Sequence, residues 1–254
     1  MTSASGLGYV LIALGPAFSL FILVISHKSF LVLTVLTSAL IWLVTLVLIA
    51  SLWRAFLPLQ TSFWLFAILL LSAVVVQEIV RVLLWRVFKK VEVALNFLAV
   101  KCSKPRLSVN DKLELALATG FGHGLAHSVF FCLSVLTPAF GPATFYIDTC
   151  RQLPYFLIVA LTSLGFLIIH TSGMVIAFNG YMDGNKGTQL FVPVIHLVAS
   201  FLTMVNIIPG GCTLGVSMIL VIAGLGAGVC GRIVWDKTGE DIIAVSTQHR
   251  MHIG

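Results

Sequence analysis

The chain carries very little charge. Only 9% of its 254 residues are Asp, Glu, Lys or Arg, while 59% are hydrophobic, and the mean hydropathy is +1.09. Soluble domains have about a quarter charged residues, so this composition excludes a chain that covers itself with polar surface in water. The net charge of +6 does not indicate nucleic-acid binding, because the basic residues cluster beside apolar runs. The sequence predicts an all-α polytopic membrane protein.

Seven apolar runs are long enough to cross a bilayer as helices, which takes about 17–25 residues. They cover residues 7–25, 30–52, 63–84, 113–137, 154–178, 190–208 and 212–234. We therefore expect a single seven-helix transmembrane domain over residues 1–254. The one long connection, from Arg86 to Asp111, mixes basic and apolar residues and predicts a short amphipathic helix on the membrane surface.

Basic residues are scarce on one side of these spans. That side has only Arg54 and Arg151. Twelve basic residues fall on the other side: Lys28, Arg86, Lys89, Lys90, Lys101, Lys104, Arg106, Lys112, Lys186, Arg232, Lys237 and Arg250. Because cytoplasmic loops are enriched in Lys and Arg, this predicts an outside N-terminus and a cytosolic C-terminus. The first span lacks the basic start and the cleavage site of a secretory signal, so we expect it to be retained.

The cysteines form no CxxC pattern. We interpret most of the five as small apolar residues within or near the spans. Cys150 and Cys212 both fall in predicted outside loops, where they could pair. The sequence leaves this pairing open.

Aspartate is absent from all seven predicted spans. An intramembrane aspartyl protease needs two Asp side chains that share a proton, so this chain cannot supply that chemistry alone. The sequence has no HExxH motif, which excludes a zinc protease of that pattern. A heptahelical receptor or transporter is disfavoured, because the seventh span has no Lys for a retinal Schiff base and no pair of broken helices marks a transport site.

The fourth span is instead rich in small residues. Its first ridge has a small residue at every fourth position: Ala116, Gly120, Gly124 and Ser128. A second ridge carries Ala118, Gly122 and Ala126. In lipid, helices associate by close backbone approach, which small residues at this spacing permit. The pattern predicts a helix-packing face, used either inside the chain or for a partner.

Ionisable residues at membrane depth usually face protein or a water-filled cavity, and the sequence offers a set of candidates for such positions. They are Glu78, Arg81, His123, His127, His170 and His196. We expect Glu78 and Arg81, at i and i+3, to pair on the helix surface, with Arg81 placed to snorkel to the interface. The histidines are expected to hydrogen-bond to neighbouring helices. A zinc site is the alternative, since four imidazoles would suffice for one.

An enzymatic interpretation rests on a weak resemblance to the glutamate-dependent membrane proteases that trim prenylated proteins. The matching segments are Gln77-Glu78-x-x-Arg81, Phe166-x-x-x-His170 and His196. The match is incomplete, because Gln77 replaces the first Glu, the Arg spacing is one residue short and Ser200 stands where Asn or Asp is expected. The alternative function is therefore a glutamate- or metal-dependent intramembrane protease using Glu78, His170 and His196.

A more specific resemblance covers essentially the whole chain. The segments that carry it are Gly15-Pro16-Ala17-Phe18-Ser19-Leu20-Phe21, Gln77-Glu78-x-x-Arg81, the first ridge, Ile169-His170-Thr171 and His196. Together with the span number and the basic loop, they resemble the anterior pharynx-defective family, the scaffold subunit of the γ-secretase complex.

The resemblance implies a non-catalytic membrane subunit without cofactor or metal. It implies assembly with presenilin, nicastrin and the presenilin enhancer subunit, presenilin supplying the two catalytic aspartates. The complex would support membrane-protein proteolysis and Notch-type receptor processing in the endoplasmic reticulum, Golgi, endomembranes and plasma membrane.

The family's functional positions map onto two sets of residues in this sequence. Its assembly ridge maps to Gly120, Gly124 and Ser128, with Ser where a third Gly is expected, and its paired histidines, associated with presenilin binding, map to His170 and His196. His123 and His127 lie outside the family's pattern, so they and the Glu78–Arg81 pair are expected only to give polar support.

Overall fold

The computed structural model describes residues 3–56, 63–134 and 145–253, and this part of the chain is built from helices joined by turns and short loops. Seven helices are long and apolar enough to cross a membrane, which confirms the predicted all-α, seven-span class. They are α1 (Ser3–Leu20), α2 (Ser29–Phe56), α3 (Phe63–Lys101), α4 (Val109–Ser128), α6 (Tyr155–Met182), α7 (Lys186–Thr203) and α8 (Gly211–Ile253). Short helical turns continue three of them: η1 (Phe21–Ile25) after α1, η2 (Val129–Leu133) after α4 and η4 (Met204–Ile207) after α7. The predicted end of the fourth span, Thr137, lies outside the described residues.

The predicted amphipathic helix after the third span is not a separate element. The chain from Phe63 to Lys101 contains neither Pro nor Gly, so nothing interrupts the helix, and α3 runs through the first part of the basic connection. It ends where Ser103 adopts a positive φ of 53° and Pro105 follows. The basic and apolar residues of this stretch therefore extend a transmembrane helix.

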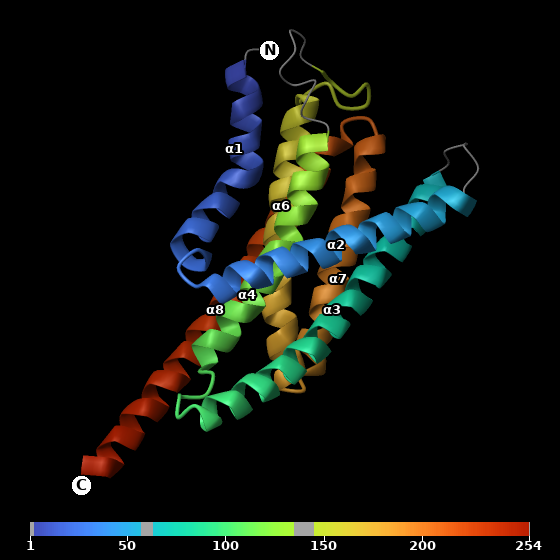
Figure 1. Cartoon of the computed structure of the whole chain (residues 1–254). Helices are drawn as coiled ribbons and strands as arrows, with labels where there is room; N and C mark the ends of the chain where they lie inside the picture. Colours follow the sequence, from blue (N-terminus) through green and yellow to red (C-terminus); the bar gives the residue numbers. More distant parts are fainter. Residues whose placement is uncertain (1–2, 57–62, 135–144, 254) are drawn as a thin grey trace.

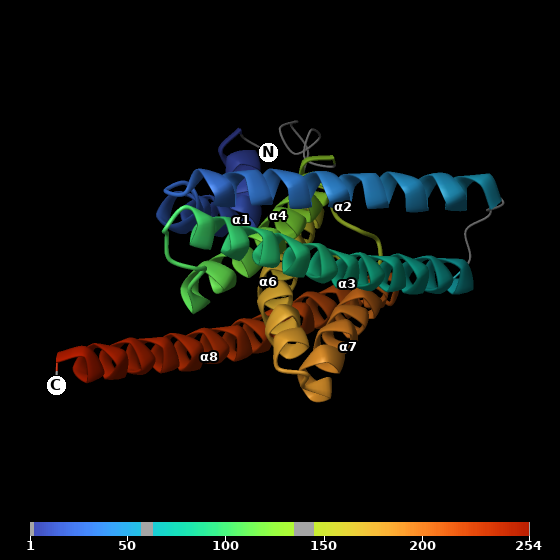
Figure 2. The same ribbon diagram turned by 60° about the horizontal axis from the view of Figure 1, so that its bottom comes forward.

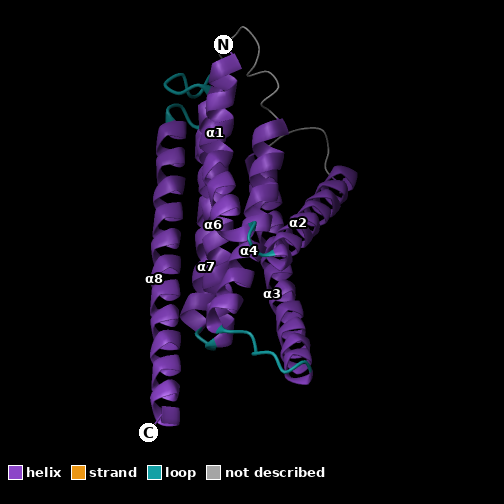
Figure 3. Ribbon diagram, turned by 60° about the vertical axis from the view of Figure 1, so that its left-hand side comes forward, coloured by secondary structure: helices purple, strands orange, loops and turns teal. Residues whose placement is uncertain are grey.

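Helix α6 lies at the centre of the bundle and packs against α1, α4, α7 and α8 (Figure 1). It is apolar all round, as a helix must be when neighbours surround it, and almost every residue from Phe166 to Gly180 is buried. Helix α2 crosses α4, and its C-terminal half leans away from the bundle beside α3 (Figures 2 and 3). The two chain ends lie at opposite ends of the bundle (Figures 1 and 3).

The second small-residue ridge of α4 faces α2. A Cβ atom added at Gly122 would lie 2.3 Å from the carbonyl oxygen of Val35 and 3.0 Å from the Cβ of Ser38. The Ser38 hydroxyl donates a hydrogen bond of 2.6 Å to the carbonyl of Thr119. Only a residue without a side chain allows this approach, so Gly122 fixes the contact between α2 and α4.

Ion pairs and a capping box hold the end of the bundle at which α4 begins. The Ser108 hydroxyl accepts from the Asp111 amide at 3.1 Å, and the Asp111 carboxylate accepts from the Ser108 amide at 3.1 Å. Lys28, in the turn before α2, pairs with Asp111 at 3.5 Å and hydrogen-bonds Glu114. The hydrogen bond with Glu114 raises the pKa of Lys28, which shows that the contact favours the charged ammonium.

The opposite end of the bundle is joined covalently. Cys150 and Cys212 form a disulfide, which answers the question that the sequence left open. The Gly210 amide donates to the Thr149 carbonyl at 2.6 Å, and the Thr149 hydroxyl donates to the Asn206 carbonyl at 2.8 Å. The segment before α6 is thereby fastened to the turn that precedes α8.

Substitution of Gly122 by Ala is expected to lower the stability of the chain. The new methyl group would collide with the Val35 backbone, and overpacking of this kind costs about 1–3 kcal/mol. Gly224→Ala in α8 is the matched control, because no atom lies within 4 Å of its added Cβ. Thermal unfolding monitored by size-exclusion chromatography in one detergent would compare them. Equal midpoints for the two variants would contradict this account.

Candidate functional site

Three side chains, Arg81 and Glu78 of α3 and His196 of α7, form a hydrogen-bonded triad that joins the two helices. Arg81 donates through Nη1 to Glu78 Oε2, and Nδ1 of His196 lies 2.7 Å from Glu78 Oε1. The side chains of Arg81 and His196 are each 2% exposed and that of Glu78 is 14% exposed. The predicted pairing of Glu78 with Arg81 is therefore present, but the predictions of a surface pair and of a snorkelling Arg81 were wrong. Because α7 covers this face of α3, the arginine is enclosed in protein.

The spacing of Glu78 and Arg81 explains how both reach the same place. Residues at i and i+3 lie on one side of a helix, and this side of α3 faces α7. A lone charge at this depth would be costly, and a neutralising partner within hydrogen-bond reach reduces that cost. Glu78 has both carboxylate oxygens engaged, so it serves here as the counter-charge of Arg81.

The four intramembrane histidines lie close together, and one of them, His196, belongs to this triad. The ring centroid of His170 lies 4.8 Å from that of His196, 5.0 Å from that of His123 and 5.1 Å from that of His127. Within the described residues, His196 is the only one of the four with a side-chain hydrogen bond, and both ring nitrogens of His123 and His170 lack a partner. The predicted hydrogen bonds to neighbouring helices are therefore found only for His196.

The structure gives no support to the alternative of a zinc site within the described residues. Among the described residues, no group of three or more His, Cys, Asp or Glu side chains is placed to hold one ion. The imidazoles instead pack against one another and against aromatic rings, with His127 stacked on Phe166 at 4.9 Å.

The first ridge of α4 brings these histidines together. A Cβ added at Gly120 would lie 2.8 Å from the carbonyl oxygen of His170, and one added at Gly124 would lie 2.8 Å from that of Leu167. Ser128 donates to the carbonyl of Ser163 at 2.8 Å. The close approach expected of this ridge is made, and α6 of the same chain is its partner. A foreign helix is thus not needed to fill the face.

Trp42 belongs to the same cluster and was missed in the sequence. Its side chain is 1% exposed, and its ring lies edge-on to His127 at 5.3 Å and to His123 at 6.1 Å. Tryptophan is enriched at the membrane–water interfaces, so a Trp near the middle of the span over residues 30–52 was the available signal. Through Trp42, α2 packs against His123 and His127 of the histidine cluster.

A cavity of about 750 Å³ borders the cluster between α2, α3, α4, α6 and α7. Its wall is mainly apolar, and Trp42, Gln77, His127 and His196 contribute to it. The Trp42 indole nitrogen and the Gln77 side-chain oxygen have no hydrogen-bond partner among the described residues. His170 does not line this cavity, so the two histidines of the expected functional pair have different surroundings.

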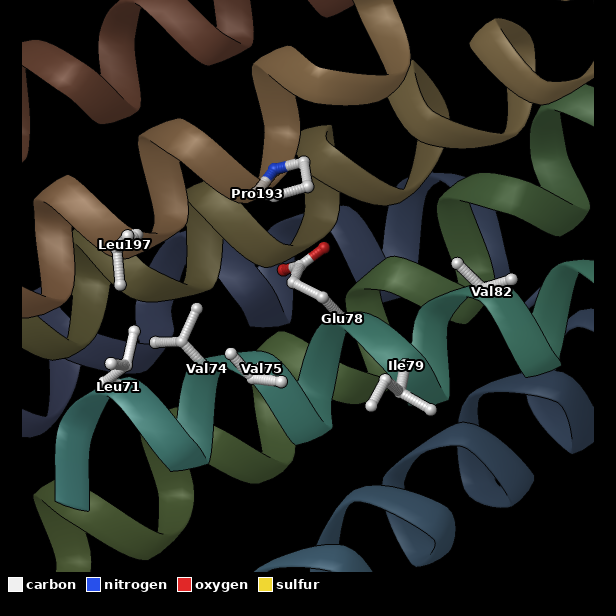
Figure 4. A pocket seen from close by; sticks show the side chains of 8 residues that line it. All are labelled: Leu71, Val74, Val75, Glu78, Ile79, Val82, Pro193 and Leu197. Carbon is white, nitrogen blue, oxygen red and sulfur yellow. The ribbon is translucent and has the colours of Figure 1, made fainter. Parts of the chain in front are cut away.

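A smaller groove of about 310 Å³ lies between α3 and α7. Figure 4 shows Glu78 on α3 directed toward α7, among the aliphatic side chains that line the groove. The lining residues are Leu71, Val74, Val75, Glu78, Ile79, Val82, Pro193 and Leu197. The groove adds no second polar group to the site.

Fold and site together define a polytopic membrane protein that encloses an ion-paired, histidine-rich centre. Residues 4–237 match the family model described as Aph-1 protein, and the chain belongs to this family. The resemblance inferred from the sequence is confirmed.

Several relatives are similar to this chain over most of their length. The chain is 53% identical over 241 residues to an Arabidopsis thaliana protein named γ-secretase subunit APH1-like, covering 94% of this chain and 96% of the relative. It is 31% identical over 206 residues to the Drosophila melanogaster γ-secretase subunit Aph-1, covering 81% and 83% of the two chains. It is 26% identical over 230 residues to the human γ-secretase subunit APH-1B, covering 88% and 87%. These comparisons give the alternative protease function no support.

Substitution of Glu78 by Gln is expected to destabilise the chain strongly. It would leave the Arg81 guanidinium buried without its counter-charge, and removing one partner of a buried ion pair costs about 3–5 kcal/mol. Asp236→Asn is the control, because Asp236 pairs with Arg232 at 3.8 Å on an exposed face of α8 and such pairs contribute little. Thermal unfolding in detergent would compare the variants. Unchanged stability of Glu78→Gln would refute the structural role given to this carboxylate.

Proposed function

We propose that the chain is a non-catalytic structural subunit of a γ-secretase-type intramembrane aspartyl protease. The observation that carries the proposal is its similarity along almost its whole length to relatives named as γ-secretase subunits. The proposed partners are presenilin, nicastrin and the presenilin enhancer subunit. The assembled enzyme would cut membrane proteins, Notch-type receptors among them.

The residues of this chain support a non-catalytic role. The predicted spans contain no Asp, so they lack the pair of carboxylates that aspartyl proteolysis requires. Glu78, the strongest candidate for a catalytic carboxylate, is engaged by Arg81 and His196. Presenilin would therefore supply the catalytic aspartates. The proposal requires no metal or cofactor.

Gly120, Gly124 and Ser128 are proposed to act in assembly through the shape of this chain. They hold α4 against α6, so changes at these positions would alter the surface that partners meet. His196 lines the large cavity and His170 packs behind it at 4.8 Å between ring centroids. We propose that His196 faces a membrane-embedded segment of presenilin and that His170 positions its ring. His123 and His127 support His170 from α4.

Two independent features support the proposed orientation, with the N-terminus outside and the C-terminus cytosolic. Most Lys and Arg residues outside the spans fall on the predicted cytosolic side. The Cys150–Cys212 disulfide falls on the other side, and disulfides persist in oxidising compartments such as the endoplasmic reticulum lumen. We propose passage through the endoplasmic reticulum and Golgi to endomembranes and the plasma membrane.

A tagged full-length chain is expected to co-purify with its proposed partners. Blue-native electrophoresis of native membranes in mild detergent should give one band containing presenilin, nicastrin and the enhancer subunit. The His170→Ala, His196→Ala double variant should insert normally but give complexes with lower protease activity, because the polar contact with presenilin is lost. Protease activity per recovered complex is the measurement.

His27→Ala provides the control for that experiment, because His27 is an exposed histidine in the turn before α2. Its complexes should retain full activity. If the unmodified chain migrates alone in blue-native electrophoresis, the proposed function is wrong. Full activity of the double variant would remove only the role of the histidine pair.

Cysteine labelling is expected to report the orientation. Cys102 is free and exposed at the proposed cytosolic end, so a membrane-impermeant maleimide should label it in sealed microsomes whose cytosolic face is outward. Cys150 and Cys212 should react only after permeabilisation and reduction. Cys102→Ser is the control and should abolish the first signal. Protection of Cys102 until the membrane is opened would show the reverse orientation.

A further inference from the structure

The last turns of α3, from Arg86 to Lys101, are attached to the bundle by one face only. Trp85 and Phe88 lie 5.4 Å and 5.3 Å from the ring of Phe178 on α6. One turn further, Glu92 pairs with Lys112 at 2.7 Å. The side-chain oxygen of Asn96 then accepts from the Leu107 amide at 3.0 Å, which folds the following loop back against the helix.

A second face of this segment is exposed and apolar. Val87, Val91, Leu95 and Leu98 follow one another at intervals of four, four and three residues, so they share one side of the helix. Their exposed fractions are 56%, 45%, 42% and 53%. This side has no covering within the described part of the chain, and at the end of a membrane-spanning helix hydrocarbon would cover it.

A third face is exposed and basic. Arg86, Lys90 and Lys101 share it by the same helical periodicity, and Phe97 lies between them with the Lys101 ammonium 4.6 Å from its ring centroid. Lys104 and Arg106 are exposed in the loop that Asn96 folds back. The five cations of this basic strip are Arg86, Lys90, Lys101, Lys104 and Arg106.

The acidic residues around the basic strip already have other partners. Glu92 is paired with Lys89 at 2.9 Å as well as with Lys112. Asp111 and Glu114 are both engaged by Lys28. No ion pair is found for the five cations of the strip within the residues that the structure describes. The strip therefore presents positive charge that the chain itself does not neutralise.

We propose that this basic strip binds the headgroups of anionic phospholipids in the leaflet at this end of the bundle. Clusters of Lys and Arg directly beyond the membrane-spanning part of a helix are typical of segments that bind anionic lipids. A phospholipid carries its negative charge and its hydrocarbon in one molecule and so matches both faces at once. An acidic protein segment would satisfy the cations alone, with a separate lipid needed to cover Val87, Val91 and Leu95. This inference does not depend on membership of a protease complex.

The full chain, reconstituted in phosphatidylcholine bilayers, would test the proposal through electron paramagnetic resonance of spin-labelled lipids. The measurement is the association constant of spin-labelled phosphatidylserine relative to spin-labelled phosphatidylcholine. We expect a preference for phosphatidylserine that weakens as salt is raised. Lys90→Gln together with Lys101→Gln should reduce this preference by up to about fivefold for each cation removed. Both leaflets have the same composition, so the result does not depend on orientation.

Lys186→Gln together with Arg232→Gln is the matched control. It removes the same charge from two exposed residues at the same end of the bundle but outside the strip. The preference should persist in this control. No preference in the parent chain, no loss in the strip variant or an equal loss in the control would each overturn the proposal. Binding of a soluble polyglutamate peptide without any phosphatidylserine preference would instead assign the strip to an acidic protein.

Discussion

The backbone approach of α4 to α6 is the contact on which the rest of this protein depends. Gly120 and Gly124 bring the two helices so close that an added methyl group would meet a carbonyl oxygen of α6. His123 and His127 lie three residues after these glycines, so the same approach sets them against His170. Gly122 then allows α2 to close on α4, which brings Trp42 to the cluster. Bare helix surface thus positions the polar side chains.

The contacts among Arg81, Glu78 and His196 fix how α3 and α7 are arranged. Hydrocarbon offers no alternative partner to Arg81, which is therefore paired with Glu78 on the same helix. Glu78 in turn contacts His196, and this contact fixes the face of α3 that meets α7. Apolar faces alone would tolerate rotation or sliding of helices, since lipid and leucine are nearly equivalent neighbours. The hydrogen-bonded triad of Arg81, Glu78 and His196 restricts both the rotation and the sliding of α3 against α7. Of the segments that carry the family resemblance, all but residues 15–21 of α1 and η1 fall on the small-residue ridge, in this triad or among the histidines beside it.

The sequence carried enough information for the class of fold and for the list of polar residues, but less for their partners. Composition and span length predict seven helices, because each property is local. The four-residue spacing of Gly120 and Gly124 predicts a helix-packing face but does not indicate which helix covers it. Likewise, the i, i+3 spacing predicts the Glu78–Arg81 pair, whereas the enclosure of the pair depends on α7, whose His196 meets Glu78 from 118 residues away. The continuity of α3 was readable, since no Pro or Gly interrupts it.

The Cys150–Cys212 bond has a consequence for the order in which the molecule is completed. Cys212 lies in the first turn of α8, so ribosomal synthesis must pass the six spanning helices that precede α8 before the crosslink can close. A chain that ends before Cys212, or that inserts with the two cysteines on different sides of the membrane, cannot form this bond. Oxidation at this position therefore reports that α8 has been made and that Cys212 has reached the same side of the membrane as Cys150.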